Sequence, residues 1–232
     1  MRNSCIVFFD FMNEFVFFAH ILLVIGSVLF VLRNFGSLGL TVFVVLQSIL
    51  ANLFVIKQMT LFGFDVTCSD VFAIGGLLSL NLIQEFFGAE QAKKAIWISF
   101  ICMVFFALMT QIHLFYIPSA SDTTHAAFSQ VLSATPRIIT ASIGVFFIVQ
   151  QIDVRLFAFL QKWFKGSKLP LRLALSLLVS QTIDTVLFSF FGLYGIVSSL
   201  YDIILVSLLI KVIAIGTSAP FTALIRRWRV YV

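Results

Sequence analysis

Long apolar segments alternate with short polar connections along the whole chain. Seven of these segments reach the length of about 20 residues that a helix needs to cross a bilayer at 1.5 Å per residue. The connections carry Gly, Pro, Ser and charged residues, and only the one at 118–135 is long. The pattern therefore predicts an all-α integral membrane protein. The seven predicted spans are 14–32, 37–57, 66–88, 95–117, 136–159, 170–194 and 198–222.

Composition supports the same class. Hydrophobic residues make up 61% of the 232 residues and charged residues 11%, and the mean hydropathy is +1.10. Soluble domains average roughly 45–50% apolar and about 25% charged. A soluble core of this length would leave too much apolar surface in water, so we expect lipid to cover it. The net charge of +5 is explained by basic loops, and no nucleic-acid partner is expected.

The charge of the loops predicts the orientation in a cell inner membrane. Cytoplasmic loops are enriched in Lys and Arg. The strongest basic cluster lies at 162–172, with others at 93–94 and 226–229, whereas the 118–135 connection has neither residue type. Placing these clusters in the cytoplasm puts the N-terminus outside and the C-terminus inside.

The first apolar segment has an alternative interpretation as a secretory signal peptide. Only Arg2 is basic before it, Asp10 and Glu14 intervene, and no small-residue cleavage pattern follows. Because signal peptides need both features, we favour a span. The predicted organisation is an extra N-terminal transmembrane helix at 1–36, a six-helix transporter domain at 37–225 and a basic cytoplasmic tail at 226–232.

Charged and amide side chains interrupt three of the predicted spans. An ionisable group at the bilayer centre costs about 2.5–3.5 kcal/mol, so such a group typically pairs with another, binds a solute or carries a proton. Three of these residues lie at i, i+3 and i+4 of the third span, on one helical face. We therefore expect a small-molecule transporter. The candidate substrate-binding residues are Asn81, Gln84, Glu85, Gln181, Asp184 and Lys211.

Both carboxylates also have simpler interpretations. Glu85 could lie at the interface and reach water, although its side chain is short and its helical face is rich in amides. Asp184 is expected deep in the sixth span and requires a partner, for which Lys211 is the obvious candidate. That ion pair could be purely structural, because buried pairs often serve specificity.

Polar residues nearer the ends of the spans form a second group of candidates. Arg137 follows Pro136 at an expected helix start, and we interpret it as an interface anchor or as a residue that closes the outer mouth against Asp70. Asp153 precedes the basic loop, so we place it at the cytoplasmic rim. The second group consists of Asn52, Asp70, Arg137, Gln151 and Asp153.

The spans after the first also suggest an internal symmetry. Spans two to four and five to seven form two three-helix halves, which would be inverted in the membrane. The middle helix of each half carries amides and an acid before FFG, in NLIQEFFG at 81–88 and SQTIDTVLFSFFG at 180–192. Many secondary transporters build a site near the bilayer midplane from such inverted repeats.

Motifs for catalysis or metal binding are missing from the sequence. It contains no HExxH, GxSxG or GxxxxGK[ST] pattern, and its three histidines share no motif. The three cysteines are scattered without CxxC spacing. We therefore expect neither an enzyme nor a bound metal or cofactor.

Several runs resemble the queuosine precursor transporter family, also called the vitamin uptake transporter family. They are NLFVIKQMTLFGFDVTCSDVFAIGGLLSLNLIQEFFGAEQAKKAIWIS at 52–99, PRIITASIGVFFIVQQIDVRLF at 136–157, SQTIDTVLF at 180–188 and the last span from Lys211 to Pro220. The resemblance implies a six-helix bundle that imports 7-deazaguanine bases for tRNA modification. It also implies functional roles for Asn52, Glu85, Arg137, Gln151, Asp153, Asp184 and Lys211.

The candidate residues suit such a substrate. A 7-deazaguanine presents N1–H and an exocyclic NH2 along one edge, with the O6 acceptor beside them. A carboxylate accepts both donors, while an amide or a lysine reaches O6, and Glu85 and Asp184 are the two candidate carboxylates. The alternatives are a transporter or substrate-binding subunit for another vitamin or planar heterocycle, and a structural subunit. Coupling to protons or sodium ions and the oligomeric state remain open.

Overall fold

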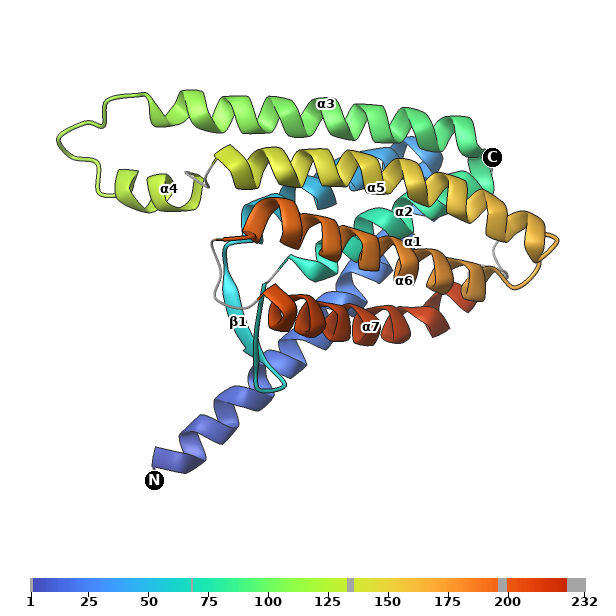
Figure 1. The fold of residues 1–232 in the computed structure, drawn as a ribbon, viewed down its shortest axis with the longest axis horizontal. Coiled ribbons are helices and arrows are strands. Elements are labelled where there is room, and N and C mark those ends of the chain that lie inside the picture. Colours follow the sequence, from blue (N-terminus) through green and yellow to red (C-terminus); the bar gives the residue numbers. More distant parts are fainter. Residues whose placement is uncertain (1, 68, 133–135, 196–199, 225–232) are drawn as a thin grey trace.

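The computed structural model describes residues 2–67, 69–132, 136–195 and 200–224. Long helices dominate it, and one short β-hairpin lies at one end of the bundle (Figure 1). The predicted basic tail at 226–232 lies outside the described residues. The elements are α1 Arg2–Phe54, β1 Gln58–Leu61, β2 Phe64–Thr67, α2 Asp70–Phe87, α3 Ala89–Leu114, α4 His125–Leu132, α5 Pro136–Trp163, α6 Leu169–Phe188, the π-helical turn η1 Ser189–Leu193 and α7 Leu200–Leu224.

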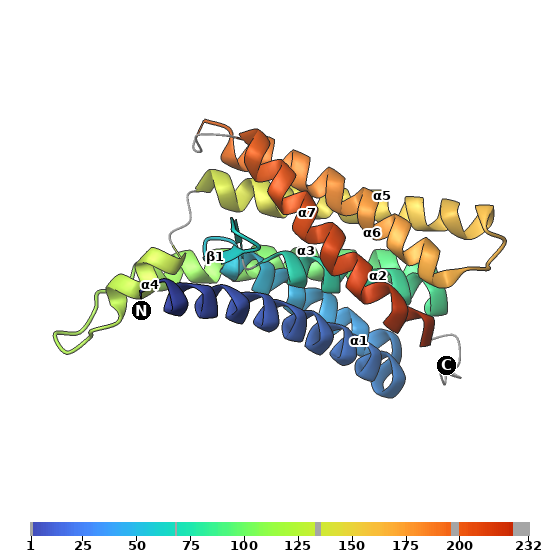
Figure 2. The ribbon, with the colours of Figure 1, turned by 90° about the horizontal axis from the view of Figure 1, so that it is seen from below.

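Helix α1 consists of two arms joined at Gly36. This residue has φ 57° and ψ −141°, a left-handed conformation that glycine adopts without steric cost. The chain reverses there, and the second arm runs back beside the first (Figure 2). The apolar stretch Met12–Phe54 has 43 residues, or about 65 Å of helix. The two arms coincide with the first two predicted spans.

The segment between α1 and α2 is a β-hairpin, where the sequence suggested only a loop. Strands β1 and β2 pair antiparallel, with Leu61 opposite Phe64. The turn residues Phe62 and Gly63 have φ of 53° and 80°, the left-handed pair that a tight two-residue hairpin requires. The Phe62 N–H donates to Glu14 Oε1 at 2.8 Å. This contact ties the hairpin to the first arm of α1.

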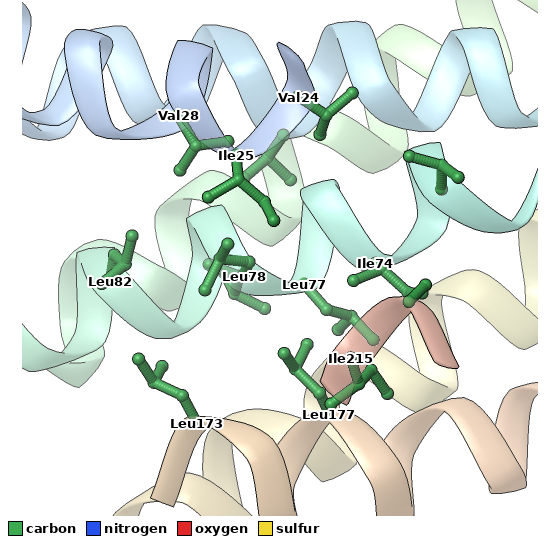
Figure 3. Packing of buried hydrophobic residues seen from close by; sticks show 14 of the residues in the cluster. Val24, Ile25, Val28, Ile74, Leu77, Leu78, Leu82, Leu173, Leu177 and Ile215 are labelled. Atoms are coloured by element: carbon green, nitrogen blue, oxygen red, sulfur yellow. The ribbon is translucent and has the colours of Figure 1, made fainter. Parts of the chain in front are cut away.

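Helix α2 is the central helix. Of its most apolar window, 72% is buried, against 22% for α3. Figure 3 shows Leu78 and Leu82 between Val24, Ile25 and Val28 of α1 on one side and α6 on the other. A Cβ on Gly75 would lie 2.5 Å from Val24 Cγ1. The two glycines at 75–76 thus permit close helix packing, and α2 continues through them without a break.

The outward faces of the other helices are apolar and exposed. On α3 they include Trp97, Ile101 and Phe105, each more than half exposed. In the described residues, five helices are long and apolar enough to cross a membrane, and Ile203–Ser218 in α7 is a shorter apolar helix. Each predicted span falls on one helix or on one arm of α1. The protein is therefore an all-α, multi-pass membrane protein.

Several predicted boundaries were wrong. Helix α3 begins at Ala89, not near residue 95, because Gly88 alone, with φ 90°, makes the turn from α2. Helix α2 begins at Asp70, after the hairpin, and not at residue 66. The long 118–135 connection contains the short helix α4.

The two ends of the bundle differ in which connections they carry. The hairpin and α4 lie at one end, together with the start of α7 (Figure 1). The α2–α3 turn and the connection between α5 and α6 lie at the other. Lys93, Lys94, Lys162, Lys165 and Lys168 all belong to this second end.

Candidate functional site

A cavity of about 400 Å³ lies between the second arm of α1, the hairpin and helices α2, α5, α6 and α7. Its volume falls in the range of small-molecule sites. Its lining includes Gln58 and Asp65 of the hairpin, both exposed. The cavity therefore opens at the hairpin end of the bundle.

Three charged residues meet at one wall of this cavity. Lys211 Nζ on α7 lies 3.1 Å from Asp184 Oδ2 on α6 and 3.6 Å from Asp70 Oδ1 on α2. It also donates to Thr185 Oγ1 at 2.9 Å. The expected pairing of Asp184 with Lys211 is confirmed, and Asp70 adds a second carboxylate. Two carboxylates and one ammonium group leave this cluster with a formal charge of −1.

Amide side chains and a hydroxyl also line the cavity. Ser142 Oγ on α5 donates to Asn52 Oδ1 on α1, and Asn52 Nδ2 donates to the Ser48 carbonyl at 3.0 Å. Gln150 and Gln181 are each only 2% exposed and line the cavity. Their Oε1 atoms are buried without a hydrogen bond. Buried acceptors normally have a donor, so these two unpaired oxygens beside the cavity are candidate acceptors for a ligand once their amide groups turn towards it.

Aromatic rings supply the apolar part of the lining. Phe72, Phe146 and Phe188 contribute to it. The Phe72 ring stacks on Phe54 with centroids 5.7 Å apart. Flat apolar surfaces beside hydrogen-bonding groups suit a planar heterocycle.

Beneath the cavity lies a second, fully buried polar layer centred on Asp153. The Ser176 and Ser180 hydroxyls on α6 donate to Asp153 Oδ1 at 2.7 and 2.6 Å. Asp153 and Asn81 are both 0% exposed. The rim position expected for Asp153 was therefore wrong: helix α5 continues to Trp163, which leaves Asp153 more than two turns inside the bundle.

An ion pair joins two helices at the end of the bundle opposite the hairpin, which we call the closed end because the cavity lining does not reach it. Arg172 on α6 is fully buried and donates to both Glu85 oxygens, with Nη1–Oε2 2.7 Å and Nη2–Oε1 2.8 Å. Its Nε donates to the Ser167 carbonyl at 2.9 Å. The guanidinium group also lies over the Phe157 ring, 5.5 Å from its centroid. This bidentate pair joins α2 to α6.

The structure divides the six main candidates into two groups. Gln181, Asp184 and Lys211 line the cavity. Asn81, Gln84 and Glu85 lie on α2 beyond the cavity lining, where Gln84 Nε2 donates to the Val154 carbonyl at 2.8 Å. The first group thus faces a space for a ligand. In the second group, Gln84 and Glu85 join α2 to other helices, while both amide atoms of Asn81 are buried without a hydrogen bond.

The secondary candidates are divided in the same way. Asn52 and Asp70 line the cavity, while Gln151 does not and its neighbour Gln150 does. Asp70 pairs with Lys211 and not with Arg137, whose Nε donates to the Phe191 carbonyl at 2.9 Å.

Sequence reasoning missed that one face of α6 carries a row of polar side chains that bind the polar groups of the neighbouring helices. Arg172, Ser176, Ser180 and Asp184 follow one another at intervals of four residues, so they share one helical face. They contact Glu85, Asp153 and Lys211 in turn. The four-residue period was a usable signal, but Arg172 was interpreted as part of the basic loop. Ser142 and Gln150 lacked such a signal, because one hydroxyl or amide in an apolar helix does not show which way it points.

A multi-pass helical bundle with a charged cavity inside its membrane domain defines the class of polytopic membrane transporters. Residues 70–225 match the family described as "putative vitamin uptake transporter". Over 189 residues the chain is 31% identical to the "probable queuosine precursor transporter" of Bacillus subtilis (strain 168). This alignment covers 79% of this chain and 82% of that protein. The chain therefore belongs to this family of transporters. No solved structure matches the chain.

Proposed function

We propose that this protein imports queuosine precursors, the 7-deazaguanine bases used for tRNA modification, by secondary transport. The observation that carries the proposal is the Asp70–Lys211–Asp184 cluster in the wall of a cavity of about 400 Å³. The name of the Bacillus subtilis relative supports the choice of substrate.

The charge of the cluster fits the donor-rich edge of such a base. Asp184 is the more accessible carboxylate, with 28% of its side chain exposed against 8% for Asp70. We therefore assign Asp184 to the N1–H and exocyclic NH2 donors of the base. In this proposal Lys211, which lies beside Asp184, exchanges its long contact to Asp70 Oδ1 at 3.6 Å for a hydrogen bond to O6. In this proposal, Gln150 and Gln181 accept from any remaining donor group.

The distribution of basic residues supports import. All lysines of the α2–α3 and α5–α6 connections lie at the end of the bundle opposite the cavity mouth. If that end is cytoplasmic, the N-terminus and the cavity mouth face outwards and the C-terminus faces inwards. The Glu85–Arg172 pair then closes the inner end, and transport requires this pair to separate while the outer mouth closes.

The proposal is tested in cells that lack both queuosine synthesis and their own importer. Expression of the protein with an external 7-deazaguanine base should restore queuosine in tRNA, measured by nucleoside analysis. Asp184→Asn and Glu85→Gln should reach the membrane but abolish the signal. Glu90→Gln is the matched control, because Glu90 is 81% exposed at the start of α3. A normal signal from Asp184→Asn would remove the site assignment, and a normal signal from Glu85→Gln would remove the proposed role of the Glu85–Arg172 pair. No signal from the membrane-inserted wild type would remove the substrate.

The family description favours a second candidate, another vitamin or planar heterocycle. A panel of unlabelled bases and vitamins that compete with labelled 7-deazaguanine uptake separates the two. Competition by an unrelated vitamin at lower concentration than the base would favour this second candidate.

A further inference from the structure

Asp153 differs from Asp70, Asp184 and Glu85 in having no basic partner. Glu14 in α1 also has no basic partner among the described residues, but it is only half-buried and accepts a hydrogen bond from the Phe62 N–H, whereas Asp153 is fully buried. Asp70 and Asp184 share Lys211, and Glu85 pairs with Arg172. Among the described residues, Asp153 forms no ion pair. Its Oδ1 accepts two serine hydroxyls, and its Oδ2 is buried without a hydrogen bond.

Among the described residues, no charged or titratable group on the helices packed against α5 forms an ion pair with Asp153. Those on α2 and α6 are held in the two ion-pair clusters described above. On α3, the charged residues belong to its first turns. These groups are Asp70 and Glu85 on α2, Arg172 and Asp184 on α6, and Glu90, Lys93, Lys94, Cys102 and His113 on α3.

Asn81 completes the surroundings of Asp153. It lies close enough to interact with the carboxylate, and both of its amide atoms are buried without a hydrogen bond. An asparagine amide offers a donor and an acceptor. It can accept from a protonated Oδ2 or, after rotation, donate to an ionised Oδ2. The pair is therefore built to accommodate both protonation states of Asp153.

The position of Asp153 lies between the cavity and the closed end. On α5, Gln150 lines the cavity one turn before Asp153, and Phe157 packs under Arg172 one turn after it. On α6, Ser176 and Ser180 lie between Asp184 at the cavity and Arg172 at the closed end. Asp153 therefore lies between the cavity and the Glu85–Arg172 pair, one helical turn from each of Gln150 and Phe157.

We propose that Asp153 is the proton-binding site that couples import to the proton gradient, an inference that rests on the transport function proposed above. A proton from the external water binds Asp153 Oδ2 through the cavity and neutralises a carboxylate that lacks a cation. The same proton leaves to cytoplasmic water after the inner end opens. Ser176, Ser180 and Asn81 also bring oxygen atoms close to Asp153, so a sodium ion is the rival occupant that the test below distinguishes from a proton.

The test uses purified full-length protein in liposomes with a labelled 7-deazaguanine base. With an acidic exterior, the wild type should accumulate the base, and a protonophore should abolish the accumulation. Asp153→Asn should lose at least tenfold of this accumulation but keep exchange of base between the two sides without a gradient to within a few-fold. Unchanged accumulation by Asp153→Asn, or accumulation driven by a sodium gradient alone, overturns the proposal.

A second measurement does not depend on the substrate. Infrared difference spectra between acidic and alkaline pH should show a protonated-carboxyl band that is present in the wild type and in Asp184→Asn but missing in Asp153→Asn. Persistence of the band in Asp153→Asn overturns the proton site. If the band behaves as expected while the wild type transports no base, the substrate assignment fails and the proton site stands.

Ser180→Ala provides an independent test in case Asp153→Asn does not fold. It keeps Asp153 and removes one of the two hydroxyl donors to Oδ1, which makes the ionised form harder to maintain. The pH profile of uptake should therefore move towards alkaline pH. A purely structural Asp153 would leave the profile in place, and an unmoved profile counts against the proposal.

Discussion

Both ends of the helical bundle carry charged and amide side chains, but only at the hairpin end do these side chains line a cavity. At the closed end, Arg172 places its donors on Glu85 and on backbone carbonyls, with Phe157 beneath it. In the cavity, the amide oxygens of Gln150 and Gln181 have no donor. The Glu85–Arg172 pair joins helices through groups that are hydrogen-bonded, whereas the two glutamines lie beside a cavity. Unpaired amide atoms also occur away from the cavity, on Asn81 and Gln84, so the position at the cavity, together with the missing donor, marks the candidate site.

The largest loss of stability is expected from breaking the Glu85–Arg172 ion pair, which we call the seal. Arg172→Leu leaves Glu85 without its cation in a mostly buried position, with 16% of its side chain exposed. Removing one partner of a buried pair costs about 3–5 kcal/mol. The melting temperature of the purified protein should therefore fall clearly, while Arg155→Leu, on the exposed face of α5, should change it little.

The double variant Glu85→Leu/Arg172→Leu sharpens this test. It removes both charges, so most of the stability should return while transport stays impaired, because the pair would no longer form and separate. A double variant as unstable as Arg172→Leu would show that the pair is not the origin of the stability.

A smaller effect on stability is expected in the cavity. Lys211→Met leaves Asp70 and Asp184 facing each other without a cation, but Asp184 has access to the cavity and its water. We expect a loss of about 1–3 kcal/mol in the free energy of unfolding and a loss of uptake of at least tenfold. Adding Asp70→Asn should recover stability, since one carboxylate then remains. Lys57→Met, at an exposed position, is the matched control, and equal effects of both lysine variants would contradict the role of Lys211.

The sequence predicted where the helices lie along the chain better than it predicted how deep individual polar residues lie in the bundle. Each predicted span falls on one helix or on one arm of α1, and helical spacing placed Asn81, Gln84 and Glu85 on one face. Asp153 was misplaced because its distance from the basic loop was used without knowing that α5 ends only at Trp163. The hairpin was missed because residues 58–65 were interpreted as a polar connection, and the turn Phe62-Gly63 is not one of the Asn-Gly or Asp-Gly pairs that usually indicate a two-residue hairpin. The division of the spans into inverted halves stays a prediction.

The contrast between a saturated seal and an unsaturated cavity predicts that binding depends on the cavity alone. The most direct test is equilibrium binding of a labelled 7-deazaguanine base to the purified protein, compared among wild type, Asp184→Asn and Glu90→Gln. Asp184→Asn keeps an acceptor for Lys211, so its stability should stay close to that of the wild type. It loses the carboxylate for the base edge, so the affinity should fall at least tenfold, or about 1.4 kcal/mol. Unchanged affinity in Asp184→Asn would contradict the assignment of this cavity as the substrate site.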